Sequence, residues 1–404
     1  MSANSPSKFT KLAWSLPWLL RYPLWRAGEM SRREQANGGS SSPQHLIFVI
    51  ANHFEPGWDA SGRILDLATQ ERRLEDWCRQ AQAIGEAVRD HDGTPFRHTN
   101  FYPAEQYHHV LLKRMAELQA AGFGEVEIHL HHGVEHPDTA ENTRRVLVEF
   151  RDALATEHLC LSRASADDEP MYAFVHGNWA LANSSGGRFC GVDSEMQILA
   201  ETGCYADLTL PSAPDVSQVA RINAIYQCGH PLNESKPHRS GPSLKVGDVP
   251  VLPVIFTGPL VFDWSRRKKG LPVPRIDNGA LTANYPLTMK RLNRWRGARI
   301  GITNRPEWIF IKLYCHGFFD EDQPAMIGHE MQRFLLEVLE ESERTRQFKV
   351  HFASAREMFN IALAAMDGYE GEPGQYRDYR LRQIMSEGRL TRAPQERSVA
   401  QQLS

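Results

Sequence analysis

The chain reads HLIFVIA from His45 to Ala51, a continuous apolar run with the length of one strand. Because the run has no polar face, it is typical of a strand that is buried on both sides, as in a parallel sheet covered by helices. The run WIFIKLY, from Trp308 to Tyr314, has the same character near the other end of the sequence. These two runs predict central strands of one sheet.

Short apolar stretches alternate with amphipathic helical periods along the rest of the chain. We expect helices at residues 70–89, 104–121, 142–158, 194–202, 328–344 and 355–366. We expect further strands at residues 96–101, 126–130, 172–175, 205–210 and 251–256. Strands that alternate with helices favour a mostly parallel sheet. The expected fold class is therefore α/β, a (β/α) barrel or part-barrel of mostly parallel strands with the helices outside.

Composition divides the chain into one large domain with a segment on either side. Residues 1–44 form an N-terminal segment that ends in a Gly- and Ser-rich stretch, typical of a flexible linker. Residues 45–368 hold the barrel-like domain, with an irregular insertion at about 222–305 that is rich in Pro, Gly and basic residues. Residues 369–404 are expected to form a polar, Arg-rich tail. With 404 residues and 41% hydrophobic content, the chain can bury a core of this size.

The overall charge gives no reason to expect a nucleic-acid partner. The formal net charge is -3 and the pI is about 6.6, so no general attraction to phosphate follows. The cysteines form no CxxC pair and no disulfide-dense spacing, which favours reduced thiols and a cytoplasmic protein. They are Cys78, Cys160, Cys190, Cys204, Cys228 and Cys315.

The N-terminal segment mixes aromatic and basic residues. Phe9, Trp14, Trp18 and Trp25 are interleaved with basic residues, and prolines interrupt the stretch. It is too short and too interrupted to span a bilayer, which needs about 20 apolar residues. Aromatic rings beside basic groups suit a membrane interface. We therefore expect peripheral contact with the inner face of a membrane through residues 9–26; the alternative is packing on the domain's own surface.

Four of the chain's 17 histidines fall within eight positions: His129, His131, His132 and His136. The residues before them alternate between apolar and polar, so the cluster lies where a strand passes into a loop. His132 and His136 would lie side by side on one helical turn. His-x-x-x-His is a common clip for a divalent metal, and neutral imidazole suits zinc. Core packing does not call for this many titratable rings in one place, so we expect a metal site.

Other strand ends carry polar residues that could meet this cluster. Residues 52–55 (Asn-His-Phe-Glu) follow HLIFVIA, and His316 follows WIFIKLY. Residues 176–179 (His-Gly-Asn-Trp) follow the strand expected at 172–175. Because the carboxyl ends of parallel strands gather at one side of a sheet, we expect these segments to line a common site.

These features resemble the NodB-like polysaccharide deacetylases, carbohydrate esterase family 4. The stretch EIHLHHGVEHPD, residues 127–138, is similar to the family motif in which His-x-x-x-His supplies two metal ligands. Residues 201–214, where a helix ends at Gly and leads into a strand, and His316 at the end of a late strand, follow the family's order. The resemblance spans residues 46–319, and only the histidine motif is specific.

The resemblance implies a metal-dependent hydrolase that removes an N- or O-acetyl group from a polysaccharide or glycan precursor in cell-surface polysaccharide biosynthesis. It implies that His132 and His136 hold a divalent metal, by ligand type zinc, with Glu55 or else His53 as the third ligand. The catalytic residues would be His53, Glu55 and His316, with a base at His53 or Glu55 and with His316 protonating the leaving group. The residues expected to bind the sugar are His176, Asn178 and Trp179.

The chain departs from the family at two places. The chain has Asn52, His53 and Glu55 where the family usually has two acidic residues, one a base and one a metal ligand. His176-Gly-Asn178-Trp179 stands where the family has an Arg near a Pro.

Three other functions stay open on the sequence. A glycoside hydrolase needs two carboxylates roughly 5 to 9 Å apart, and Glu55 with Asp207 is the obvious pair. An amidohydrolase barrel would use His129 and His131. A non-catalytic carbohydrate-binding or assembly protein would keep the fold without the acidic motif. Activity that survives chelation would favour the glycosidase, whereas a stoichiometric ion required for activity would favour the deacetylase.

Overall fold

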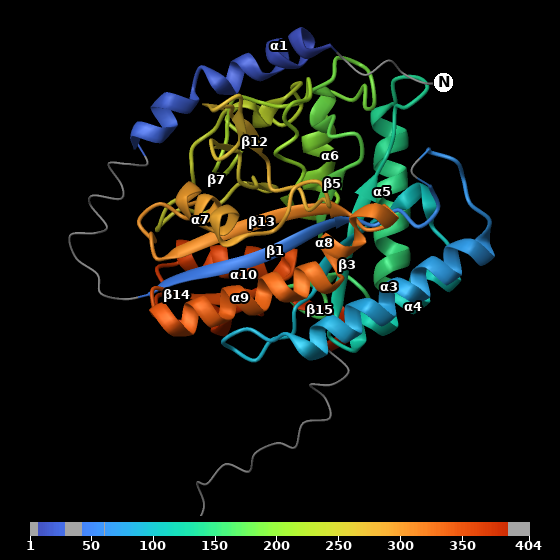
Figure 1. Ribbon diagram of the computed structural model, residues 1–404. Coiled ribbons are helices and arrows are strands. Elements are labelled where there is room, and N and C mark those ends of the chain that lie inside the picture. Colours follow the sequence, from blue (N-terminus) through green and yellow to red (C-terminus); the bar gives the residue numbers. More distant parts are fainter. Residues whose placement is uncertain (1–6, 29–42, 60, 387–404) are drawn as a thin grey trace, which may run out of the picture.

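The computed structural model describes residues 7–28, 43–59 and 61–386, and its core is a mostly parallel sheet flanked by helices (Figure 1). The α/β class expected from the sequence is confirmed at this level. Residues 34–42 of the expected linker lie outside the described residues. In pairing order the strands are β13 (Trp308–His316), β1 (Gln44–His53), β2 (His98–Pro103), β3 (Gly124–Leu130), β5 (Tyr172–His176), β6 (Cys204–Asp207), β8 (Val254–Phe256) and β7 (Ile225–Tyr226), with β14 (Phe348–Phe352) pairing on β1.

β1 has neighbours on both sides and carries two apolar faces, whereas β13, expected to be a central strand, stands at one end of the strand order among the described residues. It pairs in parallel with β13 along nearly its whole length, with β14 over its first half and with β2 at its end. Leu46, Phe48 and Ile50 belong to the core on one face, and Ile47 and Val49 belong to the core on the other. Burial of both faces is the reason that HLIFVIA is apolar without interruption.

Amphipathic helices cover the first of these two faces. Their apolar stripes pack into the same core as Leu46 and Phe48. This layer consists of α3 (Leu67–Ala87), α4 (His109–Ala120), α5 (Ala140–Thr156), α6 (Glu195–Glu201), α7 (Met289–Ala298), α8 (Gln323–Met326) and α9 (His329–Thr345). The helix expected at residues 104–121 is split, because the turn η1 (Ala104–Gln106) precedes α4.

The other face of the sheet is covered by α10 (Ala355–Met366), which is buried along its entire length. α10 packs with Ile47 and Val49 and lies against β1, β5 and β6. The side chain of Ser354 caps the helix, and Glu357 completes the capping box. Within the described residues the hydrogen-bonded strand order is open, with β13 and β7 at its ends.

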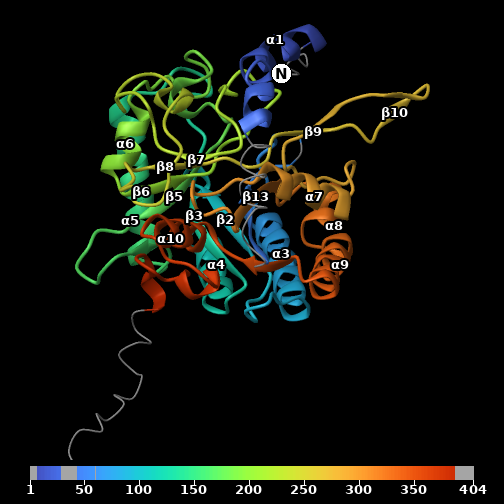
Figure 2. The same ribbon diagram turned by 90° about the vertical axis from the view of Figure 1, so that its left-hand side faces the viewer.

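The region expected to be an irregular insertion contains short strands and α7. β9 (Val261–Asp263) pairs with β12 (Arg275–Asp277), and β10 (Arg267–Lys268) pairs with β11 (Leu271–Pro272). Figure 2 shows the β10 hairpin projecting away from the body of the molecule. The basic run that it carries is exposed.

The N-terminal helix α1 (Lys8–Leu19) lies across the top of the domain in Figure 1. Its Trp18 is fully buried and packs with Ile222 and Leu260. Phe9, by contrast, is 85% exposed. In the parts of the chain that the structure describes, no helix has the length and apolar character needed to cross a membrane.

The C-terminal segment packs on the body as far as residue 386, although the sequence predicts a polar tail from residue 369. β15 (Arg382–Gln383) pairs with β4 (Ser162–Arg163). Arg377 donates to the carboxylates of Asp90 and Asp92, at 2.9 Å in both cases. These contacts fix the segment next to β14 and α10.

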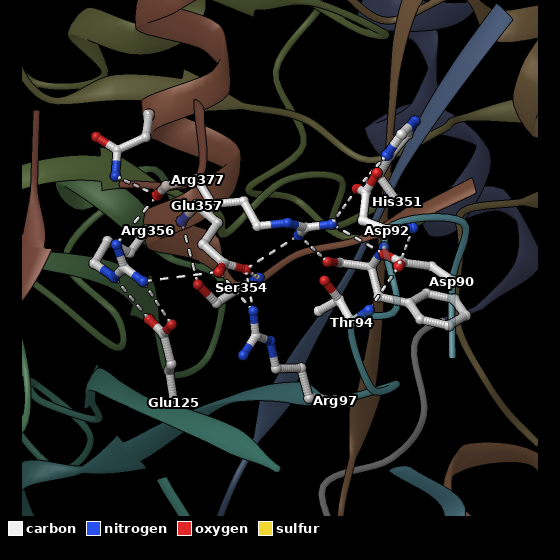
Figure 3. A network of polar contacts seen from close by, with 12 residues as sticks. Asp90, Asp92, Thr94, Arg97, Glu125, His351, Ser354, Arg356, Glu357 and Arg377 are labelled. Carbon is white, nitrogen blue, oxygen red and sulfur yellow. Dashed lines mark hydrogen bonds and ion pairs between the residues drawn. The ribbon is translucent and has the colours of Figure 1, made fainter. Parts of the chain in front are cut away.

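Arg377 is part of a network of buried ion pairs near the amino ends of β2 and β3 (Figure 3). Arg356 of α10 donates to Glu125 at 3.0 Å, and Arg97 donates to Glu357 at 2.5 Å. Because each charge has an opposite partner, the network can be buried without an isolated ion.

Candidate metal centre

Several strand ends singled out in the sequence lie at the same edge of the sheet. In the register of β1 with β13, His53 stands opposite His316. In the register of β3 with β5, Leu130 stands opposite His176. Parallel pairing keeps the carboxyl ends in step, so side chains from β1, β3, β5 and β13 converge there.

A cavity of about 520 Å³ opens at this edge. Its wall includes five of the residues expected at the site, which are His53, Glu55, Asn178, Trp179 and His316. Aromatic surface is added by Trp58, Phe318 and Phe319. The cavity thus combines apolar faces with a small number of converging polar groups, as small-molecule sites do.

Beside the cavity, His53, Glu55 and His129 each bring a ligand atom within 4.8 Å of the others. Nε2 of His129 lies 3.1 Å from Oε1 of Glu55. The rings of His53 and His129 meet edge to face, with centroids 4.8 Å apart. His129 was not among the expected ligands. The signal for it was the period-two alternation of β3, which puts His129 on the polar face with Glu127 and His131.

The hydrogen bonding of His129 fixes which of its nitrogens faces Glu55. Nδ1 lies 2.7 Å from the carbonyl oxygen of Val175 and must carry a proton to donate to it. In the neutral ring Nε2 then presents a lone pair to the Glu55 carboxylate. Two electron-pair donors 3.1 Å apart repel each other. A proton or a metal ion is therefore required between them.

His131 stands next to this group and bridges two carboxylates. Its Nδ1 lies 2.6 Å from Glu105, and its Nε2 lies 3.2 Å from Glu55. Burial alone would lower the pKa of His131, but the hydrogen bonds to Glu105 and Glu55 outweigh burial and raise the pKa to about 9. In the same way, hydrogen bonding with His129, which needs a second proton on that ring, and with His131 overcomes burial and holds the pKa of Glu55 well below its usual range. At neutral pH His131 is a cation and Glu55 is an anion.

The other two imidazoles at the cavity are neutral. Burial, followed by the neighbouring His316 and His129 rings, lowers the pKa of His53 well below its usual range. Burial also lowers the pKa of His316. His316 stacks on Phe319 at an interplanar angle of 8°. Neutral imidazole is the form that binds a metal or accepts a proton.

The loop after β5 holds Trp179 at the cavity in a strained backbone conformation. Its φ of 57° lies in the left-handed region, which is unusual for a bulky residue and is found most often at functional sites. The N–H of Trp179 donates to the carbonyl of Gly177 at 2.5 Å. Oδ1 of the neighbouring Asn178 is buried and accepts no hydrogen bond from the part of the chain that the structure describes. It is suited to accept one from a ligand.

The structure does not bring together the metal trio expected from the sequence, Glu55, His132 and His136. The segment between β3 and α5 contains no helical turn, so the four-residue spacing does not pair the two rings. Gly133, with a φ of 62°, turns the chain after His132. His132 is buried, where Asp138 lies 2.9 Å from its Nδ1, whereas His136 is exposed.

His132 and His176 instead meet each other, together with Cys190 and Glu195. His176, which was expected to bind the sugar, is fully buried in this group. Asp207, the expected partner of Glu55 in a glycosidase, is also fully buried and accepts a hydrogen bond from a Thr hydroxyl two residues along. Neither residue is exposed for contact with a substrate.

Searches against protein-family models, curated proteins and solved structures find no match to this chain, so the function has to be inferred from the chemistry of the site itself.

Proposed function

We propose that this chain is a metal-dependent hydrolase that removes an acetyl group from a carbohydrate. The observation that carries the proposal is the trio His53, Glu55 and His129, which offers two imidazoles and a carboxylate beside an open cavity. Three protein ligands with a position left for water are characteristic of catalytic zinc sites. For the fold, we propose a part-barrel of the NodB-like kind, with its site at the carboxyl ends of the strands.

The residues present fit a divalent metal of the zinc type. His53 is neutral and Glu55 is ionised, as metal ligands have to be. His129 donates its Nδ1 proton to a backbone carbonyl, which is the usual support for a histidine that binds metal through Nε2. In this proposal Glu55 and His53, the two alternatives expected for the third ligand, both hold the metal, and His129 joins them in place of His132 and His136.

When bound, such a metal would lower the pKa of a water molecule and polarise the carbonyl oxygen of the acetyl group. His316 lies beside His53, with ring centroids 4.6 Å apart, and its neutral ring can take a proton and return it to the leaving oxygen or nitrogen. The His131 cation can stabilise negative charge that develops on the carbonyl oxygen. His316 therefore keeps its expected role, and His131 gains one.

Aromatic and polar groups around the cavity support a carbohydrate as the substrate. The ring of Trp58 meets His131 with centroids 4.8 Å apart, and the ring of Trp179 meets His316 at 6.4 Å. Indole faces pack well on the apolar faces of pyranose rings, while Asn178 and Asp59 offer oxygens to sugar hydroxyls.

The test combines metal analysis with acetate release from acetylated chito-oligosaccharides and acetylated xylan, using protein purified without a histidine tag. We expect His53→Ala with His129→Ala to lose one bound divalent ion and to release acetate at the uncatalysed rate. His316→Ala should keep the ion and lower kcat by about 10²- to 10⁴-fold. The matched control is His109→Ala, which alters an exposed imidazole in a group of His and Glu side chains elsewhere.

Two results would contradict the proposal. One is acetate release that survives both chelation and the double substitution. The other is cleavage of glycosidic bonds without any metal requirement, which would favour a glycoside hydrolase.

A further inference from the structure

A second group of potential ligands lies outside the proposed catalytic trio. His132 follows β3, His176 ends β5, Cys190 lies in the loop before α6, and Glu195 is the first residue of α6. His176, Cys190 and Glu195 have 0% of their surface exposed, and His132 has 7%. Four different segments thus direct polar atoms to one buried point.

The spacing of the two imidazole nitrogens and the Glu195 oxygen is close to that of a tetrahedral metal site, and the Cys190 sulfur lies within 4.8 Å of all three. Nε2 of His132 lies 3.1 Å from Nε2 of His176 and 2.9 Å from Oε1 of Glu195. Nε2 of His176 lies 3.5 Å from the same oxygen, and Sγ of Cys190 lies 3.6 Å from Oε2 of Glu195. With metal–nitrogen and metal–oxygen bonds of about 2.0 Å, tetrahedral ligand atoms lie about 3.3 Å apart.

Surrounding hydrogen bonds orient two of these groups, His132 and Glu195, inward. Asp138 and the Thr143 hydroxyl lie 2.9 Å and 3.1 Å from Nδ1 of His132, which leaves Nε2 for the centre of the group. Carboxylate support of this kind is typical of metal-bound histidine. The N–H of Ala182 donates to Oε2 of Glu195 at 2.5 Å, which fixes that carboxylate.

The loop that carries Cys190 is packed closely against the loop that carries His132. The N–H of Asp138 donates to the carbonyl of Cys190 at 2.7 Å, and the N–H of Phe189 donates to the carbonyl of Gly133 at 2.9 Å. A Cβ on Gly133 would lie 2.2 Å from the Cys190 carbonyl oxygen, so only glycine permits this approach. The backbone thereby holds the ligands near one another whether or not an ion is bound.

We infer that His132, His176, Cys190 and Glu195 bind a second divalent metal of the zinc type, with four protein ligands and no open position. A thiolate together with imidazoles selects zinc over magnesium or calcium. Two neutral imidazoles, one thiolate and one carboxylate carry two negative charges, which a divalent cation neutralises inside the protein. Four protein ligands characterise a structural site.

This ion would hold the two loops that form one wall of the cavity. His132 directly follows His131, and His176 directly precedes Gly177, Asn178 and Trp179. Tying His132 to His176 therefore sets the position of the proposed charge-stabilising ring relative to the strained Trp179. The second site does not require the hydrolase proposal to be correct, since its ligands differ from the catalytic trio.

Cobalt(II) is a direct probe of this site, because a thiolate ligand gives it a charge-transfer band in the near ultraviolet. We expect the full chain, stripped of metal and reloaded with cobalt, to bind two ions and to show the band. Cys190→Ser should lose the band and one ion. Cys228→Ser, which changes a thiol outside the group, should keep both. His53→Ala with His129→Ala should lose the other ion and keep the band.

Circular dichroism and thermal melting check that each variant is folded. A folded, cobalt-loaded protein without a thiolate band overturns the proposal, and so does a band that persists unchanged in Cys190→Ser. If Cys190→Ser does not fold, the spectra of the unaltered protein and of Cys228→Ser decide the question. Failure of acetate release with an intact band would remove the hydrolase proposal and leave this one in place.

Discussion

At the residue scale, the site holds neutral and positively charged histidines next to one another. His53 and His316 are neutral because burial lowers their pKa values, whereas hydrogen bonds to Glu105 and Glu55 raise the pKa of His131 to about 9. The pKa values differ because the His131 ring forms hydrogen bonds with two carboxylates. That arrangement gives the cavity a neutral proton acceptor and a fixed positive charge side by side.

Gly177 allows these rings to pack as closely as they do. A Cβ there would lie 2.4 Å from Cδ2 of His131 and 2.7 Å from the carbonyl oxygen of Leu130. We expect Gly177→Ala to displace His131, to lower the free energy of unfolding by about 1–3 kcal/mol and to slow acetate release. Urea unfolding and kinetics measure both effects. Gly28→Ala is the control, since a Cβ there meets nothing within 4 Å. If Gly177→Ala has the same stability and the same rate of acetate release as the original protein, the close packing at Gly177 is contradicted.

The candidate residues at strand ends could be predicted, but their grouping could not. His53, Glu55 and His316 follow apolar strands, and parallel strands bring such positions to one edge. The expected pairing of His132 with His136 required a helical turn, and no turn forms because Gly133 redirects the chain. Which ring joins which carboxylate depends on loop geometry that a spacing pattern does not contain.

At the element scale, helices and strands with one dominant period were predictable to within a few residues. The bounds of α10 were predicted as well, but the burial of its polar residues was not. Its Arg356, Glu357 and Asn360 would normally mark a solvent face, yet all are buried. Their partners come from far away in the sequence: Glu125 accepts from Arg356, and Asn360 donates to the carbonyl of Arg377 at 2.7 Å. Burial of this helix therefore depends on tertiary pairing that its own sequence does not reveal.

The ion pairs of Glu357 make stability depend on pH (Figure 3). Burial alone would raise its pKa, but Arg97, Arg377 and Arg356 lower it from 4.5 to about 2. A depressed pKa stabilises the fold above pH 4.5, and this contribution, roughly 3 kcal/mol, is lost as the pH falls from 4.5 towards 2.

We expect Glu357→Gln to lower the free energy of unfolding at pH 7 by about 3–5 kcal/mol, because it leaves buried arginines without their partner. The variant has no carboxylate to protonate at this position, so it does not lose stability there in acid. Its stability should therefore approach that of the unaltered chain below pH 4.5. Urea unfolding between pH 7 and pH 3 measures this convergence. The stability of the control Glu321→Gln, which changes an exposed residue, should follow that of the unaltered protein at every pH. If the difference in stability between Glu357→Gln and the unaltered protein stays constant from pH 7 to pH 3, the ion pairs of Glu357 are not the source of the pH dependence.

At the scale of the whole molecule, the two ends of the sheet have different chemistry. Ion pairs near the amino ends of β2 and β3 join α10 and the C-terminal segment to the body. Two of the groups that can hold metal lie at the carboxyl ends of β1, β3 and β5, and a third, formed by His45, His351 and Glu372, lies near the amino end of β1. The buried ion pairs lie at the amino ends of the strands, whereas the cavity opens at the carboxyl ends, where parallel α/β proteins usually place their sites.

α1 adds a surface that neither end of the sheet explains. Trp18 anchors it on the body, while Phe9, Leu12, Leu16 and Leu20 are 85%, 54%, 47% and 73% exposed. Their spacing of three to four residues places them along one side of the helix. Lys8 and Lys11 stand on the same helix and supply positive charge. An apolar stripe with basic neighbours fits the surface of an anionic bilayer, which supports peripheral attachment through residues 9–26.

We expect the full chain to float with vesicles that contain anionic lipid and not with neutral vesicles. Replacing Phe9, Leu12 and Leu16 with Ser should abolish flotation, because each buried apolar side chain contributes about 1.5–3 kcal/mol to partition. Trp18 is left in place, so the helix keeps its anchor and the fold is not disturbed. Val249→Ser with Val251→Ser removes exposed apolar surface elsewhere and should leave flotation unchanged. If the α1 variant floats as well as the unaltered chain, α1 is only a cover for the domain beneath it.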